Sequence, residues 1–195
     1  MTYISQKWLD VLVPFTENYA QRLTGSSIAA GVHMPQKTVS RILDSLGSKR
    51  IIKYSRDGKN KYYYFDLHDK MSSVVLSMTE HTKALRVLMN DPHLRTMLAE
   101  LMEYGTVVLF GSYAKGMQRE GSDVDLWMVA RKKNLKRIVE KYPYEVHLQF
   151  STLDEFLRKL ANGHHLAVEI ARHHVVFGNA DAIVDGLARY WGVKA

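Results

Sequence analysis

Cysteine is missing from all 195 residues of the sequence. This absence excludes disulfides, thiolate metal sites and cysteine nucleophiles, and it is compatible with a reducing compartment. No apolar run reaches the roughly 18 residues that a membrane-spanning helix requires. The start, MTYISQKWLD, lacks the basic-then-apolar pattern of a signal peptide. We therefore expect a cytoplasmic protein with no membrane partner.

Negative charge is scarce in the amino-terminal third. Residues 1–67 hold ten Lys and Arg but only five Asp and Glu, so this third carries +5 of the chain's net charge of +7. Cations concentrated in one region are typical of a surface that binds a polyanion. The amino-terminal third is therefore the candidate polyanion-binding region.

The same third has the pattern of three helices followed by a β-hairpin. Apolar residues recur at helical spacing, and Pro35 suits a first helical turn because its missing N–H would be unpaired there. Asp57-Gly58 is a strong signal for a hairpin turn between two runs of β-formers. We expect these elements in the following order: helices over 4–20, 26–31 and 35–46, then the hairpin over 51–67.

The stretch SSIAAGVHMPQKTVSRILDSLGSKRIIKYSRDGKNKYYYF resembles the winged helix-turn-helix of bacterial and archaeal transcription regulators. The resemblance implies that the second helix of the pair enters the major groove of double-stranded DNA, while the wing contacts phosphates. The DNA-binding candidates are Gln36, Lys37, Thr38, Ser40 and Arg41 on the helix and Arg56, Lys59 and Lys61 on the wing. The helix would turn Val39, Ile42 and Leu43 inward. The alternative is a winged helix that serves only protein contact or dimerisation.

Residues 68–104 contain no glycine and keep helical spacing of their apolar positions. Pro92 divides this segment into two helices, which we interpret as a connector. Winged-helix regulators commonly dimerise, so the connector helices are candidates for the contact of a homodimer.

Strands and helices alternate from residue 105 onward. The strands are expected over 106–110, 124–130, 144–150 and 174–177. The intervening helices are expected over 132–142, 152–161, 164–172 and 180–191. This alternation indicates an α/β or α+β domain. For the whole chain we expect an α+β protein in three parts, 1–67, 68–104 and 105–195.

The stretch VVLFGSYAKGMQREGSDVDLWMVA, residues 107–130, sets two carboxylates at the start of an apolar strand. Successive side chains of a strand point to opposite faces, so Asp123 and Asp125 share one face while Val124 faces the core. Two such carboxylates suit a hard divalent ion, Mg²⁺ or Mn²⁺, that keeps substrate phosphates among its ligands. Gly111 and Ser112 follow a strand and open a helix, where backbone N–H groups and a hydroxyl can bind a phosphate.

LFGSYAKGMQREGSDVDLWMV resembles the signature of the minimal nucleotidyltransferases of the DNA polymerase beta superfamily, a Gly-Ser, about ten residues, then Asp-x-Asp between apolar residues. The resemblance implies a mixed sheet with flanking helices and transfer of a nucleoside monophosphate from an NTP to an acceptor. It assigns the metals to Asp123 and Asp125 and the triphosphate to Ser112. Gly111 and Lys115 complete the nucleotide-binding candidates.

The superfamily usually supplies a third carboxylate from a later strand. In YEVHLQF the polar face holds Glu145, His147 and Gln149. Glu145 is the candidate third catalytic carboxylate, and His147 is the alternative occupant of that position. A site with only two good carboxylates could bind nucleotide and metal without turnover.

The favoured function is a Mg²⁺-dependent nucleotidyltransferase, coupled to DNA binding, whose acceptor is an unidentified nucleic acid or protein. One alternative is a transcription regulator whose transferase-like domain senses nucleotide or binds a partner without catalysis. Another is an antitoxin whose acceptor is a partner toxin. Whether the protein is an enzyme therefore depends on the third-ligand position.

Overall fold

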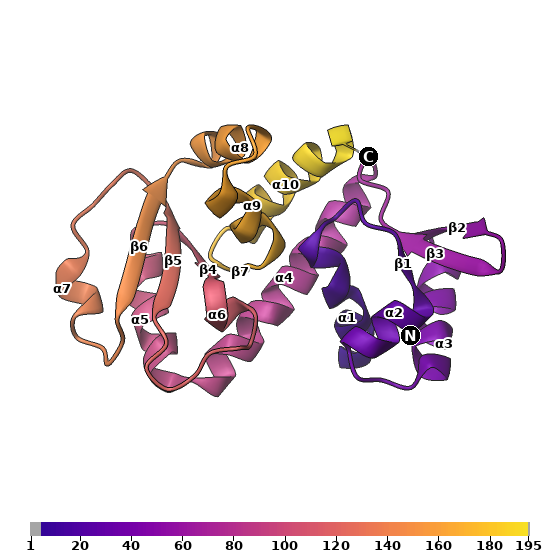
Figure 1. The fold of residues 1–195 in the computed structure, drawn as a ribbon, viewed down its shortest axis with the longest axis horizontal. Coiled ribbons are helices and arrows are strands. Elements are labelled where there is room, and N and C mark those ends of the chain that lie inside the picture. The colour runs from indigo at the N-terminus through magenta and orange to yellow at the C-terminus, as the bar shows by residue number, and fades with distance from the viewer. Residues whose placement is uncertain (1–4, 195) are drawn as a thin grey trace. The chain divides into compact units, whose positions relative to one another are not determined.

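The computed structural model describes residues 5–194 (Figure 1). Ile4, where the first predicted helix begins, lies outside the described residues. Contacts divide the chain into two units: one contains the residues before 80 together with those after 186, and the other contains residues 80–186. The α+β class is confirmed, because each unit combines helices with its own sheet. None of the helices in the described part is long and apolar enough to span a membrane.

The first unit contains short helices and a small antiparallel sheet. Its elements are α1 (Gln6–Leu12), the 3₁₀ helix η1 (Val13–Glu17), β1 (Leu23–Thr24), α2 (Gly25–Gly31), α3 (Gln36–Ser48), β2 (Lys53–Asp57), β3 (Asn60–Tyr64) and the start of α4 (Lys70–Asn90). The sheet has the strand order β1-β3-β2, and all its pairs are antiparallel. The predicted hairpin at Asp57-Gly58 is confirmed, since Asp57 pairs with Asn60.

Local sequence explains where these helices begin. The first predicted helix changes from α to 3₁₀ geometry at Val13, next to Pro14, which lacks the N–H that an α-helix would use. Thr24 caps α2, because its hydroxyl accepts from the Ser27 N–H while Ser27 reaches back to the Thr24 N–H. The helix predicted over 35–46 is confirmed as α3, but it begins at Gln36, with Pro35 as its N-cap rather than in its first turn, and it ends at Ser48.

The second unit is built on a four-stranded mixed sheet with flanking helices. Its elements are the end of α4, α5 (Pro92–Met102), β4 (Thr106–Phe110), α6 (Gly111–Ala114), β5 (Val124–Val129), α7 (Lys136–Val139), β6 (Val146–Ser151), α8 (Leu153–Ala161), α9 (His165–Arg172), β7 (Val175–Phe177) and the start of α10 (Ala180–Lys194). The strand order is β6-β5-β4-β7; β5 and β6 are parallel, and β4 is antiparallel to both β5 and β7.

Most predicted elements of this unit are confirmed, with one marked difference. Pro92 does separate two helices, with Asp91 capping α5 through the Leu94 N–H. The helix predicted over 132–142 is a single turn, Lys136–Val139. Only Leu135 and Val139 of that segment are buried. Because most helical stability comes from tertiary packing, the packing of these two side chains stabilises only about one turn of helix.

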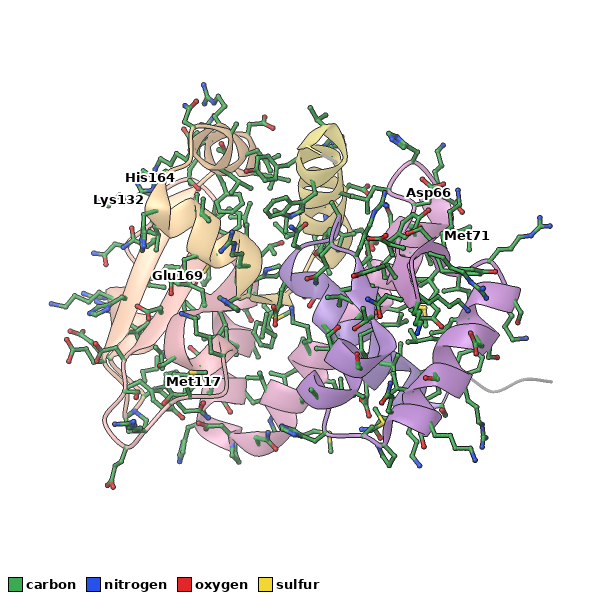
Figure 2. The ribbon with its side chains drawn as sticks, turned by 45° about the vertical axis from the view of Figure 1, so that its right-hand side comes forward. Asp66, Met71, Met117, Lys132, His164 and Glu169 are labelled. Carbon is green, nitrogen blue, oxygen red and sulfur yellow. The ribbon has the colours of Figure 1, made fainter. Side chains whose placement is uncertain are left out.

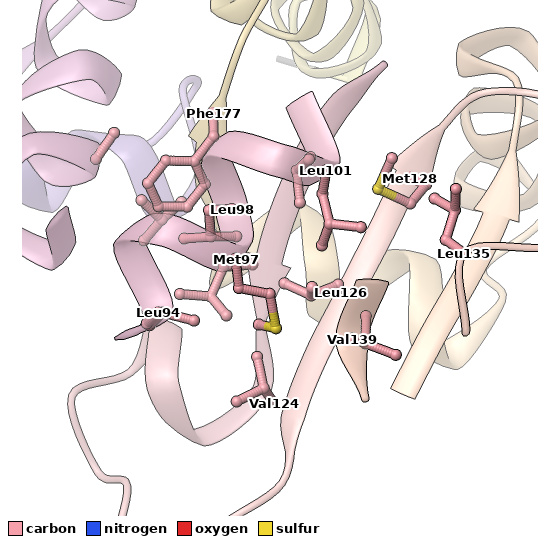
Figure 3. Packing of buried hydrophobic residues seen from close by; sticks show 14 residues of the cluster. Leu94, Met97, Leu98, Leu101, Val124, Leu126, Met128, Leu135, Val139 and Phe177 are labelled. Carbon is pink, nitrogen blue, oxygen red and sulfur yellow. The ribbon is translucent and has the colours of Figure 1, made fainter. Parts of the chain in front are cut away.

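Strand β5 divides the two faces of the sheet. Val124, Leu126 and Met128 pack with α5 in the main core (Figure 3). The alternate residues face the other side, where the Trp127 indole stacks on Phe156 of α8 with ring centroids 4.1 Å apart. The Trp127 N–H donates to the Ser151 hydroxyl at 2.9 Å. Burial on both faces fixes the strand that carries the carboxylate pair.

Candidate nucleotide and metal site

Asp125 lies in the middle of the sheet, between partners on two neighbouring strands. Its Cα is in register with Phe110 on antiparallel β4 and with His147 on parallel β6. Its side chain is 29% exposed, so the carboxylate is partly shielded yet accessible. Asp123 directly precedes β5. The shared face predicted for Asp123 and Asp125 from strand alternation stays a prediction. The two predicted metal-binding residues thus come from one rigid segment.

Gly111 and Asp125 fit against each other closely. Gly111 has a φ of +69°, a conformation that favours glycine. A Cβ built on Gly111 would lie 2.2 Å from Oδ2 of Asp125 and 3.1 Å from its Cγ. A side chain of any size at position 111 would therefore displace the carboxylate. The sequence suggests glycine here for the approach of a phosphate, and the structure adds the approach of Asp125.

Ser112 and Lys115 extend from the end of β4. Ser112 is the second residue of α6, in a first turn whose N–H groups have no acceptor within the helix. The Lys115 ammonium forms an ion pair with Glu169 of α9 at 2.7 Å (Glu169 is labelled in Figure 2). The hydrogen bond from Lys115 lowers the pKa of the Glu169 carboxyl. Lys115 is therefore held by α9, and binding of a phosphate would have to compete with Glu169.

Glu169 could not be identified from the sequence. It lies 54 positions beyond Lys115, and no local motif joins the two residues. Its placement depends on how α9 packs in the folded unit.

The two candidates for the third position lie beside each other on β6 and its approach. His147 Nδ1 is 3.4 Å from Asp125 Oδ1, and His147 Nε2 is 3.7 Å from Glu145 Oε1. The Glu145 side chain is 75% exposed and the His147 side chain 49% exposed. His147 therefore lies between the carboxylate of Asp125 and that of Glu145. The role of Glu145 as a catalytic carboxylate stays a prediction.

Two tyrosines connect this site to the start of α5. The Tyr113 and Tyr144 rings meet edge to face, 6.4 Å apart. The Tyr144 hydroxyl donates to Asp91 at 2.7 Å, and burial together with this hydrogen bond raises the pKa of Tyr144. Asp91 also caps α5, so one carboxylate holds both the helix and the tyrosine next to the Gly-Ser turn. These contacts link α6, through Tyr113 and Tyr144, to the start of α5.

The carboxylate side chains at this site are suitable ligands for a hard divalent cation, although there are only two of them in the predicted metal site. Asp123 and Asp125 are carboxylates two positions apart at the start of β5. The Asp125 carboxylate lies against Gly111, at the Gly-Ser turn. Within residues 5–194, no group of three or more His, Cys, Asp or Glu side chains is arranged to hold a metal ion. A metal bound here would therefore use the aspartates with waters and substrate oxygens as further ligands.

The candidate DNA-binding residues of α3 lie on the side opposite its core residues. Val39, Ile42 and Leu43 are buried, as the sequence predicts. Gln36, Lys37 and Arg41 are exposed, and Thr38 and Ser40 are partly exposed. The helix thus presents polar and cationic side chains on one face.

The three DNA-binding candidates of the wing differ in their exposure and in their ion pairs. Arg56 and Lys59 are exposed. Lys61 forms an ion pair with Asp44 of α3 at 2.6 Å, and its ammonium lies 4.0 Å from the centre of the Tyr54 ring. The hydrogen bond from Lys61 lowers the pKa of Asp44. Lys61 thus joins the wing to α3, and contact with a phosphate would compete with Asp44.

Comparison with known proteins finds a similarity to one family model. Residues 93–178 match the family model described as Polymerase beta, Nucleotidyltransferase. The matched range contains Gly111, Ser112, Asp123 and Asp125, and it covers less than half of the chain. Comparison with curated proteins and with solved structures found no match for the chain. Nucleotidyl transfer is thus supported at the level of the family.

Proposed function

We propose that this chain is a Mg²⁺- or Mn²⁺-dependent nucleotidyltransferase of the cytoplasm. It transfers a nucleoside monophosphate from an NTP to a nucleic acid or protein acceptor. The observation that carries the proposal is the fit of the Asp125 carboxylate against Gly111, at the point where β4 ends in the Gly-Ser turn. The family match to residues 93–178 supports the same reaction class.

In this proposal different residues of the chain bind the metal and the triphosphate. Asp123 and Asp125 hold the metal, and Ser112 with the backbone N–H groups of α6 binds the triphosphate. The bound metal supplies stabilisation of the charge that develops on the transferring phosphoryl group and on the leaving pyrophosphate. Asp125 is kept in position by its strand neighbours and by Gly111, which is the preorganisation that transfer requires.

We also propose that the first unit is a winged helix-turn-helix that binds double-stranded DNA. The element order α1, β1, α2, α3, β2, β3 and the strand order β1-β3-β2 support this proposal. Helix α3 would enter the major groove with Gln36, Lys37, Thr38, Ser40 and Arg41, while Arg56, Lys59 and Lys61 would approach phosphates. The +5 charge of residues 1–67 favours a polyanionic partner.

A second candidate function is a nucleotide-sensing regulator without catalysis. The observation that favours it is His147, whose imidazole lies 3.4 Å from Asp125 on the neighbouring strand. If this position normally carries the third catalytic carboxylate, the chain has replaced an anionic ligand there with an imidazole. Nucleotide would then bind without transfer.

Equilibrium NTP binding with and without Mg²⁺ tests the site that both functions share. Asp123→Asn with Asp125→Asn should remove the Mg²⁺-dependent part of NTP binding in a folded protein. Asp154→Asn, an exposed residue of α8, is the matched control and should leave binding unchanged. Mg²⁺-dependent binding that survives the double substitution would refute the site assignment. Glu145→Gln and His147→Ala then show which residue turnover requires, if the wild type turns over.

A further inference from the structure

The segment 131–141 concentrates positive charge in a unit that is otherwise acidic. It contains six Lys and Arg and one Glu, which gives it a net charge of +5. The other residues of the unit, 80–130 and 142–186, contain eight Lys and Arg and 13 Asp and Glu, a net charge of −5. The unit is therefore neutral as a whole, and its positive excess lies in eleven consecutive residues. Such a concentration is typical of a surface that binds a polyanion.

Most of this positive charge lies outside regular secondary structure. Residues 131–135 form neither helix nor strand, and α7 is a single turn. An amphipathic helix, in which charged residues cover the solvent side, therefore does not account for the run Arg131-Lys132-Lys133.

Three cations of the segment are exposed and have no acidic partner. Lys136 pairs with Glu140 at 3.4 Å, and Lys141 pairs with Glu100 at 2.6 Å. Within residues 5–194, by contrast, no carboxylate pairs with the exposed side chains of Arg131, Lys132 and Arg137. Lys132 is labelled in Figure 2. These three charges are available to the phosphates of a ligand.

A groove of about 430 Å³ lies between this segment, which includes α7, and strand β6 (Figure 1). Its walls include four aliphatic side chains and two cations: Leu135, Val139, Val146, Leu148, Lys133 and Lys136. Glu140 also lines the groove, where it is paired with Lys136.

The groove lies close to the candidate metal site. Strand β6 is at the edge of the sheet, next to β5. Val146 and Leu148 line the groove, so by strand alternation His147 faces the other side of β6, where it lies 3.4 Å from Asp125. The single strand β6 therefore separates the groove from the candidate site.

An exposed aromatic ring lies beside the cationic segment. Tyr104 is 38% exposed, and the Lys133 ammonium lies 5.3 Å from the centre of its ring. Proteins that bind single-stranded nucleic acid combine cations that follow the phosphates with aromatic rings on which bases stack. Residues 131–141 and Tyr104 supply both.

We propose that residues 131–141 and Tyr104 bind single-stranded nucleic acid, and that nucleic acid is the acceptor class of this protein. The phosphates contact Arg131, Lys132 and Arg137, and a base stacks on Tyr104. The ring favours nucleic acid over an acidic protein, because Asp and Glu side chains have no base to stack on it. The role of the bound strand as acceptor rests on the proposed nucleotidyl transfer, whereas the binding itself does not.

Fluorescence anisotropy of the full chain with labelled single-stranded RNA and DNA of about 12 nucleotides tests the binding. Every variant is made in a Lys37→Ala, Arg41→Ala parent, in which the proposed α3 surface is weakened. Arg131→Ala with Lys132→Ala and Arg137→Ala should weaken binding. It should also reduce the slope of log affinity against log salt by about 2, since each single-strand phosphate contact contributes about 0.7.

A matched control removes the same charge elsewhere in the unit. Arg158→Ala with Lys159→Ala and Arg172→Ala changes exposed positions of α8 and α9, and it should keep the slope of the parent. Equal slopes for the two triple variants would overturn the proposal, as would a parent that binds neither oligonucleotide.

Tyr104→Leu separates stacking from charge. It should lower the affinity about tenfold and leave the salt slope unchanged, because the ring contributes stacking and no charge. A thermal unfolding curve like that of the parent shows that the variant is folded. An unchanged affinity in the folded variant would overturn the stacking role of Tyr104.

Competition with poly-glutamate tests the class of partner. Unlabelled oligonucleotide should displace the labelled strand at a much lower concentration of charge than poly-glutamate does. Equal competition, charge for charge, would overturn the proposal in favour of an acidic protein partner. Label transfer to a protein acceptor by a chain that binds no oligonucleotide would refute this inference and leave the proposed transfer intact.

Discussion

The carboxylate of Asp125 lies against the α-carbon of Gly111, so that a Cβ at position 111 would come within 2.2 Å of Oδ2. These two residues are 14 positions apart, and antiparallel pairing of β4 with β5 brings them together. Glycine is thus needed both for its φ of +69° and for the space that Asp125 occupies. The Gly-Ser turn and Asp125 therefore pack directly against each other.

Gly111→Ala should violate both requirements. Comparison with a second glycine of similar φ separates the loss of space beside Asp125 from backbone strain alone. The left-handed conformation should cost about 1–2 kcal/mol of unfolding free energy, and the displaced Asp125 should remove Mg²⁺-dependent NTP binding. Gly116→Ala is the matched control, because Gly116 has a φ of +65° and no atom within 4 Å of an added Cβ. Chemical denaturation and NTP titration of both variants measure the two effects. Equal NTP binding by the two variants would contradict the account.

Much of this site could be predicted from the sequence, because its residues lie close together in the sequence and depend on local backbone structure. Strand alternation predicts that Asp123 and Asp125 share a face, and the strand predicted over 106–110 matches β4 residue for residue. The turn at Gly111 is likewise a local property of a short sequence motif.

Features that depend on long-range packing could not be predicted in the same way. The contact of His147 with Asp125 requires the parallel register of β6, which no local pattern sets. The pairs Lys115–Glu169 and Lys61–Asp44 join residues that are distant in the sequence. The helical spacing of α4 likewise identifies its apolar residues without showing that five of them face solvent.

Glu80 should make the protein sensitive to acid. Burial by itself would raise the pKa of Glu80, but the charges of Lys83 and His174 outweigh it and lower the pKa from 4.5 to about 2. The folded-state pKa is thus below the unfolded one, so the ionised carboxylate adds stability above about pH 4.5. That stability is lost as the pH falls toward 2.

Glu80→Gln should therefore lose about 3 kcal/mol of unfolding free energy at neutral pH, because Lys83 and His174 lose their buried anion. The loss should shrink as the pH falls from 4.5 toward 2. Denaturant unfolding at several pH values measures this dependence, with Glu103→Gln as an exposed control. A Glu80→Gln variant with the stability and pH profile of the wild type would refute the buried ion pair.

Lys37→Ala with Arg41→Ala should weaken DNA binding and flatten its dependence on salt. Each lost phosphate contact should reduce the slope of log affinity against log salt by about 0.9. Arg158→Ala with Lys159→Ala removes the same charge from exposed positions of α8 and serves as the control. Fluorescence anisotropy with duplex DNA at several salt concentrations gives both slopes. Identical slopes for the α3 and α8 variants would exclude α3 as the DNA-binding helix.

The most direct test of the central claim is transfer of label from each of four α-labelled NTPs in the presence of Mg²⁺ or Mn²⁺. The acceptors offered should be DNA, tRNA, cell lysate and the protein itself. We expect label to appear in one acceptor class with the wild type, and to fall to the no-enzyme level with Asp123→Asn and Asp125→Asn. Transfer that is equal in the wild type and the folded double variant would contradict the account, as would the absence of transfer to any acceptor.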